Sequence, residues 1–95
     1  MPYKIGITTN PEERRVYWQN RTTGFTNWQI LEIFRSKAAA REYETEYALR
    51  HGCEVAPSDL DFLGREKESA TEHEYWWYVY YFGYETEKPN HMLNR

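Results

Sequence analysis

The sequence predicts an α+β fold in which helices flank a small antiparallel sheet, and two kinds of pattern support this prediction. Residues 3–9 alternate in polarity, with Ile5 and Ile7 on one side, as in a strand that has one buried face. Helices are marked by their capping residues instead. The longest expected helix has Ser36 as its N-cap and Gly52 at its C-terminal end.

A first helix is expected over residues 11 to about 19, directly after the first strand. Its N-cap is Asn10, a proline occupies the first helical position, and Glu13 completes a capping box. Arg14 and Arg15 then lie in the first turn, where the positive end of the helix dipole disfavours cations. Because local stability does not explain these arginines, we expect at least one of them to have a function.

The other elements follow from similar patterns along the chain. They are a polar loop over residues 20–27, an apolar strand over 28–34, the helix from Ser36 to Gly52, a weakly patterned stretch over 53–74 with a turn at 57–59 and a charged loop or short helix at 64–74, an almost wholly aromatic strand over 75–82, and a polar surface tail over 84–95.

Side chains of the second helix fall on distinct sides. Ala40, Tyr43, Tyr47 and Arg50 share one side at helical spacing. Glu44 is expected at the edge of this packed stripe. From there its carboxylate would reach a shallow site beside the sheet.

Composition indicates a single soluble, cytoplasmic domain over residues 1–95. The chain is 40% hydrophobic but contains no run of the roughly 20 apolar residues that span a bilayer, and no signal peptide is visible. No membrane partner is therefore expected. The single cysteine, Cys53, fits a reducing compartment, and with His51 it gives only two metal-type ligands, too few to predict a metal site.

The charge of the chain is unevenly distributed. The net charge is -3, which argues against a protein that coats polyanions in general. However, eight of the twelve basic residues lie within residues 1–50. The first half could therefore present a local basic face, so nucleic acid remains a possible partner.

Residues 3–51 resemble the GIY-YIG nuclease superfamily in two motifs. Lys-Ile-Gly at residues 4–6 stands where the family has Tyr-Ile-Gly, and Arg14 follows the glycine by eight positions, as the essential arginine of the family does. A Ser-Lys-x-x-Ala start at residues 36–40 resembles the helix that carries the metal-binding glutamate of the family. This motif puts Glu44 at the metal-ligand position.

The resemblance implies a metal-dependent DNA endonuclease, or a domain descended from one that still binds DNA. Glu44 would hold Mg²⁺ or Mn²⁺, since carboxylate oxygen suits a hard cation that keeps most of its waters. Arg14 would support the scissile phosphate through its fixed charge and forked donors. DNA is then the expected partner, and Arg15, Arg21 and Lys37 are the expected additional phosphate contacts.

The chain also departs from the family pattern. Lys4 replaces the motif tyrosine, and Tyr3 cannot substitute for it because adjacent strand residues face opposite sides. Lys4 would contact phosphate, or act as a base if burial lowered its pKa. The usual first strand, Gly-Ile-Tyr, is missing before Tyr3. Residues 75–82 are expected to supply it, as in a circular permutation, with Tyr80 in the place of its tyrosine.

Other interpretations remain open. Arg14 could be a solvated surface residue, Glu44 one of several solvating acids, and Tyr80 part of the core. A second function is a non-catalytic scaffold that binds a protein partner through exposed aromatic residues within 75–84, for example a small phage-type effector acting on a host protein. A third is a structural domain with a fortuitous motif.

Overall fold

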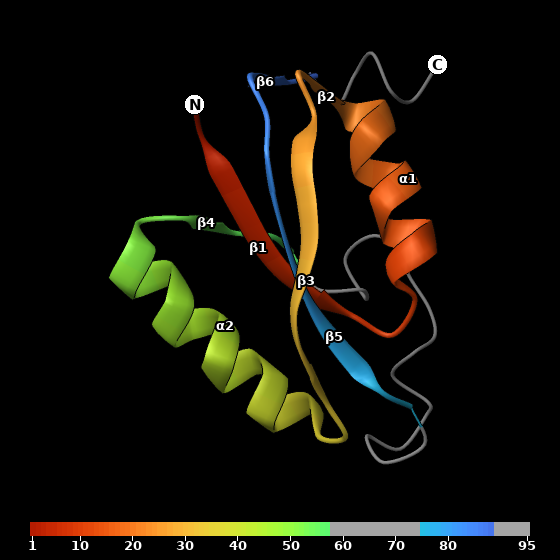
Figure 1. Cartoon of the computed structure of the whole chain (residues 1–95), viewed down its shortest axis with the longest axis vertical. Coiled ribbons are helices and arrows are strands. Elements are labelled where there is room, and N and C mark those ends of the chain that lie inside the picture. Colours follow the sequence, from red (N-terminus) through yellow and green to blue (C-terminus); the bar gives the residue numbers. More distant parts are fainter. Residues whose placement is uncertain (58–74, 89–95) are drawn as a thin grey trace.

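The computed structural model describes residues 1–57 and 75–88 of the chain. These residues form a four-stranded sheet with one helix on each face, and a separate two-stranded sheet (Figure 1). In chain order the elements are β1 (Tyr3–Thr8), α1 (Pro11–Arg21), β2 (Thr22–Thr23), β3 (Thr26–Phe34), α2 (Lys37–His51), β4 (Glu54–Val55), β5 (Trp77–Gly83) and β6 (Thr86–Glu87).

Strand β5 lies inside the main sheet, whose order is β3-β5-β1-β4. It runs antiparallel to both neighbours and pairs Tyr80 with Gly6 of β1. The predicted pairing of the aromatic strand with the first strand is thus confirmed. The expectation of a wholly antiparallel sheet was wrong, because β4 pairs parallel to β1, with Ile5 opposite Val55. A parallel pair requires a long crossover, which here contains both helices.

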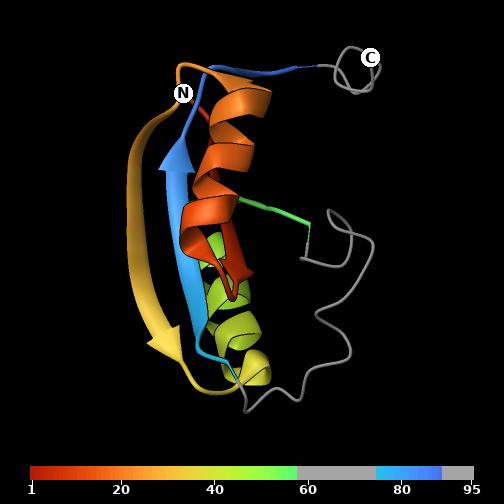
Figure 2. The same ribbon diagram turned by 90° about the vertical axis from the view of Figure 1, so that its right-hand side faces the viewer.

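The two helices cover opposite faces of the main sheet. Trp77 and Val79 of β5 pack in one core cluster with Ala40 and Ala48 of α2. The alternate residues Tyr80 and Phe82 pack in a second cluster with Trp18 of α1. Figure 2 shows α1 in front of the sheet and α2 behind it. We call these the α2 face and the α1 face.

The predicted N-caps and the C-terminal glycine of α2 are confirmed, whereas the Asn10 N–H donates to Oγ1 of Thr8 and not to the Glu13 side chain of the predicted capping box. The Asn10 side chain accepts a hydrogen bond from the backbone N–H of Glu13, and Ser36 caps α2 in the same way. Gly52 ends α2 in the left-handed region, with φ of 69°, and donates its N–H to the carbonyl of Ala48. These local signals fix both ends of α2 and so determine where the crossover to β4 begins.

The segment after Gly83 differs from the predicted surface tail. Tyr84 is buried, and β6 pairs antiparallel with β2, which places Thr86 opposite Thr23. Pairing with a strand 63 residues earlier leaves no local sequence signal. The turn and loop predicted within residues 58–74, and the end of the tail at 89–95, lie outside the described residues. No helix in the described ranges has the length and apolar character needed to cross a bilayer.

A glycine in β1 makes room for the central tyrosine. A Cβ atom on Gly6 would lie 2.4 Å from the Tyr80 hydroxyl oxygen and 2.5 Å from Cζ of the same ring. Tyr80 has no exposed surface, so its ring has little freedom to move aside. Gly6 is therefore required by packing between β1 and β5.

We predict that Gly6→Ala lowers the free energy of unfolding by about 3 kcal/mol, because the added methyl group overpacks a buried ring. Gly52→Ala is the matched control: its Cβ meets nothing within 4 Å, so only the strain of the left-handed φ remains, about 1 kcal/mol. Urea denaturation of both variants measures the difference. Equal losses at the two positions would contradict the close approach of Tyr80 to Gly6.

Candidate functional site

Three of the predicted site positions lie on the α1 face of the sheet. Lys4 and Gly6 alternate with the isoleucines of β1 that face α2, and Gly6 is opposite Tyr80. Arg14 and Trp18, four residues apart, are the buried residues of α1. The structure therefore brings Lys4, Tyr80 and Arg14 to the same face, beneath α1.

Tyr80 is a core residue whose hydroxyl group binds inside the protein. Its oxygen accepts a hydrogen bond from Nε1 of Trp18 at 3.0 Å. The ring stacks on Trp28 of β3 with 5.0 Å between centroids. This one side chain thus connects β5, β3 and α1.

Lys4 is held by two acidic residues. Its Nζ donates to Oε1 of Glu54 at 2.7 Å and lies 3.3 Å from Oε1 of Glu87. The Tyr84 hydroxyl donates to the same Glu54 oxygen at 2.7 Å. Burial alone would lower the pKa of Lys4, but the hydrogen bond to Glu54 and the charge of Glu87 raise it overall. Lys4 is consequently a charged, paired ammonium group, and the expectation of a base with a lowered pKa was wrong.

The guanidinium of Arg14 is enclosed, and the residue is 3% exposed. Its Cζ lies 5.5 Å from the centroid of the Tyr17 ring, and Cζ of Arg21 lies 4.3 Å from the same ring. Burial raises the pKa of Tyr17, although the two arginines oppose this shift. Arg14 is therefore part of the packing between α1 and the sheet, and the interpretation of a solvated surface arginine was wrong.

The three predicted phosphate contacts are dispersed. Arg15 pairs with Glu12 on the exposed side of α1, with 3.3 Å between Nη2 and Oε1. Arg21 stacks on Tyr17 at the other end of that helix. Lys37 begins α2, and its Nζ lies 5.3 Å from the centroid of Trp77, which belongs to the cluster on the opposite face. These side chains do not form one basic surface.

Glu44 lies on the face opposite Arg14. It is 2% exposed and lies between Ala40 and Ala48, four residues away on either side, in the buried stripe of α2. The expectation that its carboxylate would reach a shallow site at the edge of that stripe was wrong, since four-residue spacing places it at the centre. Burial raises the pKa of Glu44 to about 7, while Arg41 opposes the shift.

These positions limit the chemistry of the α1 face. In residues 1–57 and 75–88, no group of three or more His, Cys, Asp or Glu residues is arranged to hold a metal ion. Glu44 is separated by the sheet from Arg14, so the two could not act on one phosphate in this conformation. Sequence patterns did not predict the Lys4–Glu54 pair, because the partners are 50 residues apart.

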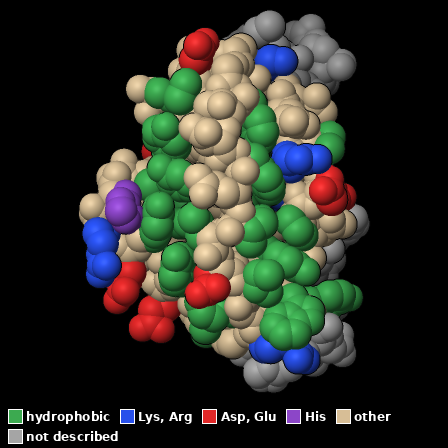
Figure 3. Space-filling model, in the orientation of Figure 1, with side chains coloured by type: hydrophobic (Ala, Val, Ile, Leu, Met, Phe, Trp, Pro, Cys, Tyr) green, Lys and Arg blue, Asp and Glu red, His purple; other side chains and the backbone are tan. Residues whose placement is uncertain are grey.

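An exposed apolar surface lies on the α1 face beyond the helix. Ile30 is opposite Tyr80, and Ile33 is opposite Tyr78. Both isoleucines are exposed, Ile33 to 46%, and Trp76 is exposed to 50%. We call Ile30, Ile33 and Trp76 the β3 patch. Figure 3 shows hydrophobic side chains gathered over and beside β3.

Arg35 borders the β3 patch. Its Cζ lies 4.5 Å from the centroid of the Trp76 ring. A guanidinium over an exposed indole ring is attracted to it by about 0.5–1 kcal/mol. Lys37 lies instead near Trp77, which belongs to the cluster on the α2 face. The β3 patch is therefore an apolar surface with positive charge at one end.

We predict that Glu44→Gln stabilises the protein, and more so at pH 8 than at pH 5. The folded-state pKa of Glu44, about 7, exceeds the ordinary value of 4.5 for a glutamate side chain. The folded state therefore binds more protons than the unfolded state between these two pH values. Stability is then lost as pH rises through this window, by about 3 kcal/mol in total. The variant should lack this loss.

Urea denaturation at several pH values measures this difference. Glu42→Gln is the matched control, because Glu42 is exposed on the same helix. The difference between wild type and Glu44→Gln should grow with pH, whereas the Glu42→Gln difference should stay constant. Parallel pH profiles for wild type and Glu44→Gln would contradict the burial of this carboxyl group.

Comparison with known proteins identifies no relative of this chain. No family model matches it, and neither a curated protein nor a solved structure matches significantly. The GIY-YIG resemblance of residues 3–51 therefore stays a prediction from the motifs. The evidence for a function comes from the contacts and exposure of the described residues.

Proposed function

We propose that this chain is a non-catalytic scaffold of the GIY-YIG type that binds a protein partner. The observation that carries the proposal is the β3 patch, an exposed apolar surface with a tryptophan at its end. Tryptophan and arginine are enriched at the energetic centres of protein interfaces. The phage-type effector named as an alternative above is one protein of this kind.

The residues at the catalytic positions support this proposal because they make internal contacts. Lys4 binds Glu54 and Glu87, and the Tyr80 hydroxyl accepts from Trp18. Glu44 is buried beneath α2, on the far side of the sheet from Arg14. Side chains that stabilise the fold in this way are not arranged around a common substrate site.

The chemistry of the β3 patch indicates the kind of partner. Two isoleucines and an indole ring offer a flat apolar contact, and Arg35 lies at its border. A complementary protein segment would present apolar side chains flanked by Asp or Glu. We therefore infer an acidic, partly apolar segment of another protein as the partner.

A metal-dependent endonuclease is the competing proposal, and one observation favours it. Lys4, Tyr80 and Arg14 lie on one face, with Gly6 beneath the tyrosine, and these are three of the four residues to which the resemblance gives a catalytic or metal-binding role. A conformational change that exposes Arg14 and Glu44 would be needed before both could contact DNA and a metal ion. The competing proposal therefore requires both Arg14 and Glu44 for cleavage, which variants at these positions can test.

Cleavage assays distinguish the two proposals. Supercoiled and branched DNA would be incubated with Mg²⁺ or Mn²⁺ and with wild type, Arg14→Lys or Glu44→Gln. We expect equal, background-level nicking in all samples. Gln19→Ala is the control, at an exposed position of the same helix, and thermal melts verify that each variant is folded. Metal-dependent nicking by wild type that both variants abolish, but Gln19→Ala retains, would overturn the non-catalytic proposal.

Partner binding requires a test at the patch itself. A photo-crosslinking amino acid at position 33 should capture a protein that the same group at position 49 does not, because Leu49 is 81% exposed on α2, away from the patch. With that protein purified, Ile33→Asp should weaken binding by about 30-fold, the effect of a hot-spot loss, while Leu49→Asp leaves it unchanged. Equal weakening by both variants would refute the β3 patch as the interface.

A further inference from the structure

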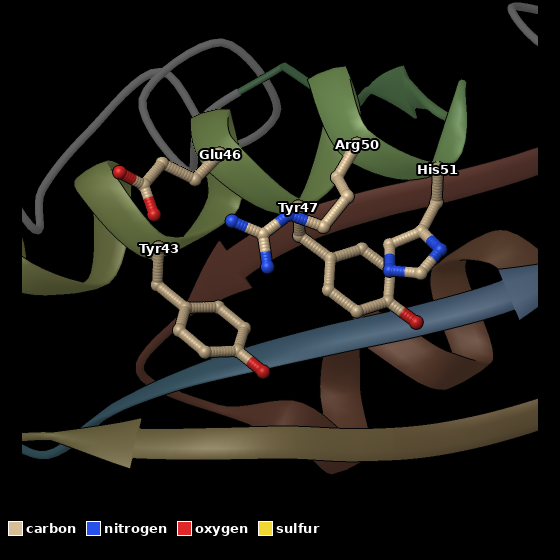
Figure 4. Close-up of a pocket in the computed structure, with 5 residues that line it drawn as sticks. All are labelled: Tyr43, Glu46, Tyr47, Arg50 and His51. Carbon is tan, nitrogen blue, oxygen red and sulfur yellow. The ribbon is translucent and has the colours of Figure 1, made fainter.

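A pocket of about 210 Å³ lies on the flank of α2, and none of the predicted site residues or β3-patch residues lines it. Its lining residues are Tyr43, Glu46, Tyr47, Arg50 and His51. Figure 4 shows all five side chains projecting from α2, with the rings of Tyr43 and Tyr47 extending toward β5 and β3. They occupy positions i, i+3, i+4, i+7 and i+8, which lie along one side of a helix. The sequence predicted no ligand for them.

Aromatic rings form the wall of this pocket. Tyr43 and Tyr47 lie nearly parallel, with 6.1 Å between centroids and an angle of 19°. His51 packs on Tyr47 at 4.2 Å, and Tyr47 meets the edge of Tyr81 from β5 at 5.4 Å. Contacts with His51 and Tyr81 restrict the Tyr47 ring, and the rings of Tyr43 and Tyr47 form part of the pocket lining. A flat ring of a ligand could stack on this surface.

Polar groups lie at different places around the rings. The guanidinium of Arg50 points toward the space between Tyr43 and Tyr47, while Glu46 and His51 lie at opposite ends of the pocket (Figure 4). Within the described part of the chain, the Arg50 side chain has no hydrogen bond or ion pair. Its donors are therefore available to an anion, and the Glu46 carboxylate can accept from an N–H group.

We propose that this pocket binds a mononucleotide whose base carries an amino group. The base would stack on the tyrosine rings, and its amino group would donate to Glu46. The phosphate would bind Arg50, whose forked donors match phosphate oxygens, with His51 beside it. A mononucleotide combines a flat ring, an N–H donor and an anion, which are the three features that this pocket can recognise.

The size of the pocket agrees with such a ligand. Pockets that enclose drug-sized molecules measure roughly 300–1,000 Å³. The smaller volume here would hold the base and leave the sugar and phosphate at the mouth, near the exposed end of α2. An open site with one guanidinium contact implies weak binding, with a Kd of about 1 mM.

Four probes separate the contributions of ring, amino group and charge. They are AMP, adenosine, phenyl phosphate and inorganic phosphate, each titrated into the full chain while NMR follows the tyrosine and histidine ring signals. AMP should bind saturably and shift the signals of Tyr43, Tyr47 and His51. Adenosine lacks the phosphate, phenyl phosphate lacks the amino group, and inorganic phosphate lacks both the ring and the amino group, so each should bind more weakly than AMP.

Variants at exposed positions test the residue roles without disturbing the core. Arg50→Gln should weaken AMP binding about tenfold through loss of a charge-assisted contact. Arg41→Gln is the matched control, because it removes the same charge from another exposed position of α2. Glu46→Gln should bring AMP and phenyl phosphate closer in affinity, because the carboxylate acceptor for the amino group is weakened.

Four results would overturn this proposal. Three are the absence of saturable AMP binding, equal binding of AMP and inorganic phosphate, and equal weakening by Arg50→Gln and Arg41→Gln. The fourth is phenyl phosphate binding as tightly as AMP, since the amino group would then make no contribution. None of these measurements depends on the protein-binding proposal, so either proposal can fail alone.

Discussion

The Tyr80 side chain makes the contact on which the rest of this fold depends. Its ring lies against Gly6 of β1 and Trp28 of β3, and its hydroxyl accepts from Trp18 of α1. One buried residue thus sets the spacing of three strands and the position of a helix. Because the hydroxyl oxygen accepts a hydrogen bond inside the protein, its burial is compatible with this packing.

Sequence patterns predicted the elements whose signals are local. Asn10, Ser36 and Gly52 act within a few residues of the positions that they cap, so the start of α1 and both ends of α2 could be inferred from the chain. The aromatic run around Tyr80 was likewise long enough to predict a strand, and the resemblance suggested its neighbour. Short strands such as β4 and β6 were missed because a strand of two residues is too short to show an alternation of apolar and polar residues.

The candidate site was harder to predict because it depends on tertiary contacts. A motif spacing placed Glu44 near a site, but the same spacing also puts it between two buried alanines on α2. Likewise, the ion pairs of Lys4 require Glu54 and Glu87, which are close to it only in the folded protein. The resemblance assigned Lys4, Arg14, Tyr80 and Glu44 to one site. The structure puts the first three on the α1 face and Glu44 on the α2 face, a division that depends on packing and not on the spacing of the motif.

The place of β5 between β1 and β3 also affects how the protein is made. Translation releases β1 and β3 well before residues 77–83, so both strands lack β5, the neighbour that lies between them, while the chain is still being synthesised. The nascent chain then exposes apolar strand edges that can pair with other chains. The β3-β5-β1 part of the sheet forms only after this late segment is released, and its insertion pairs the facing edges of β1 and β3.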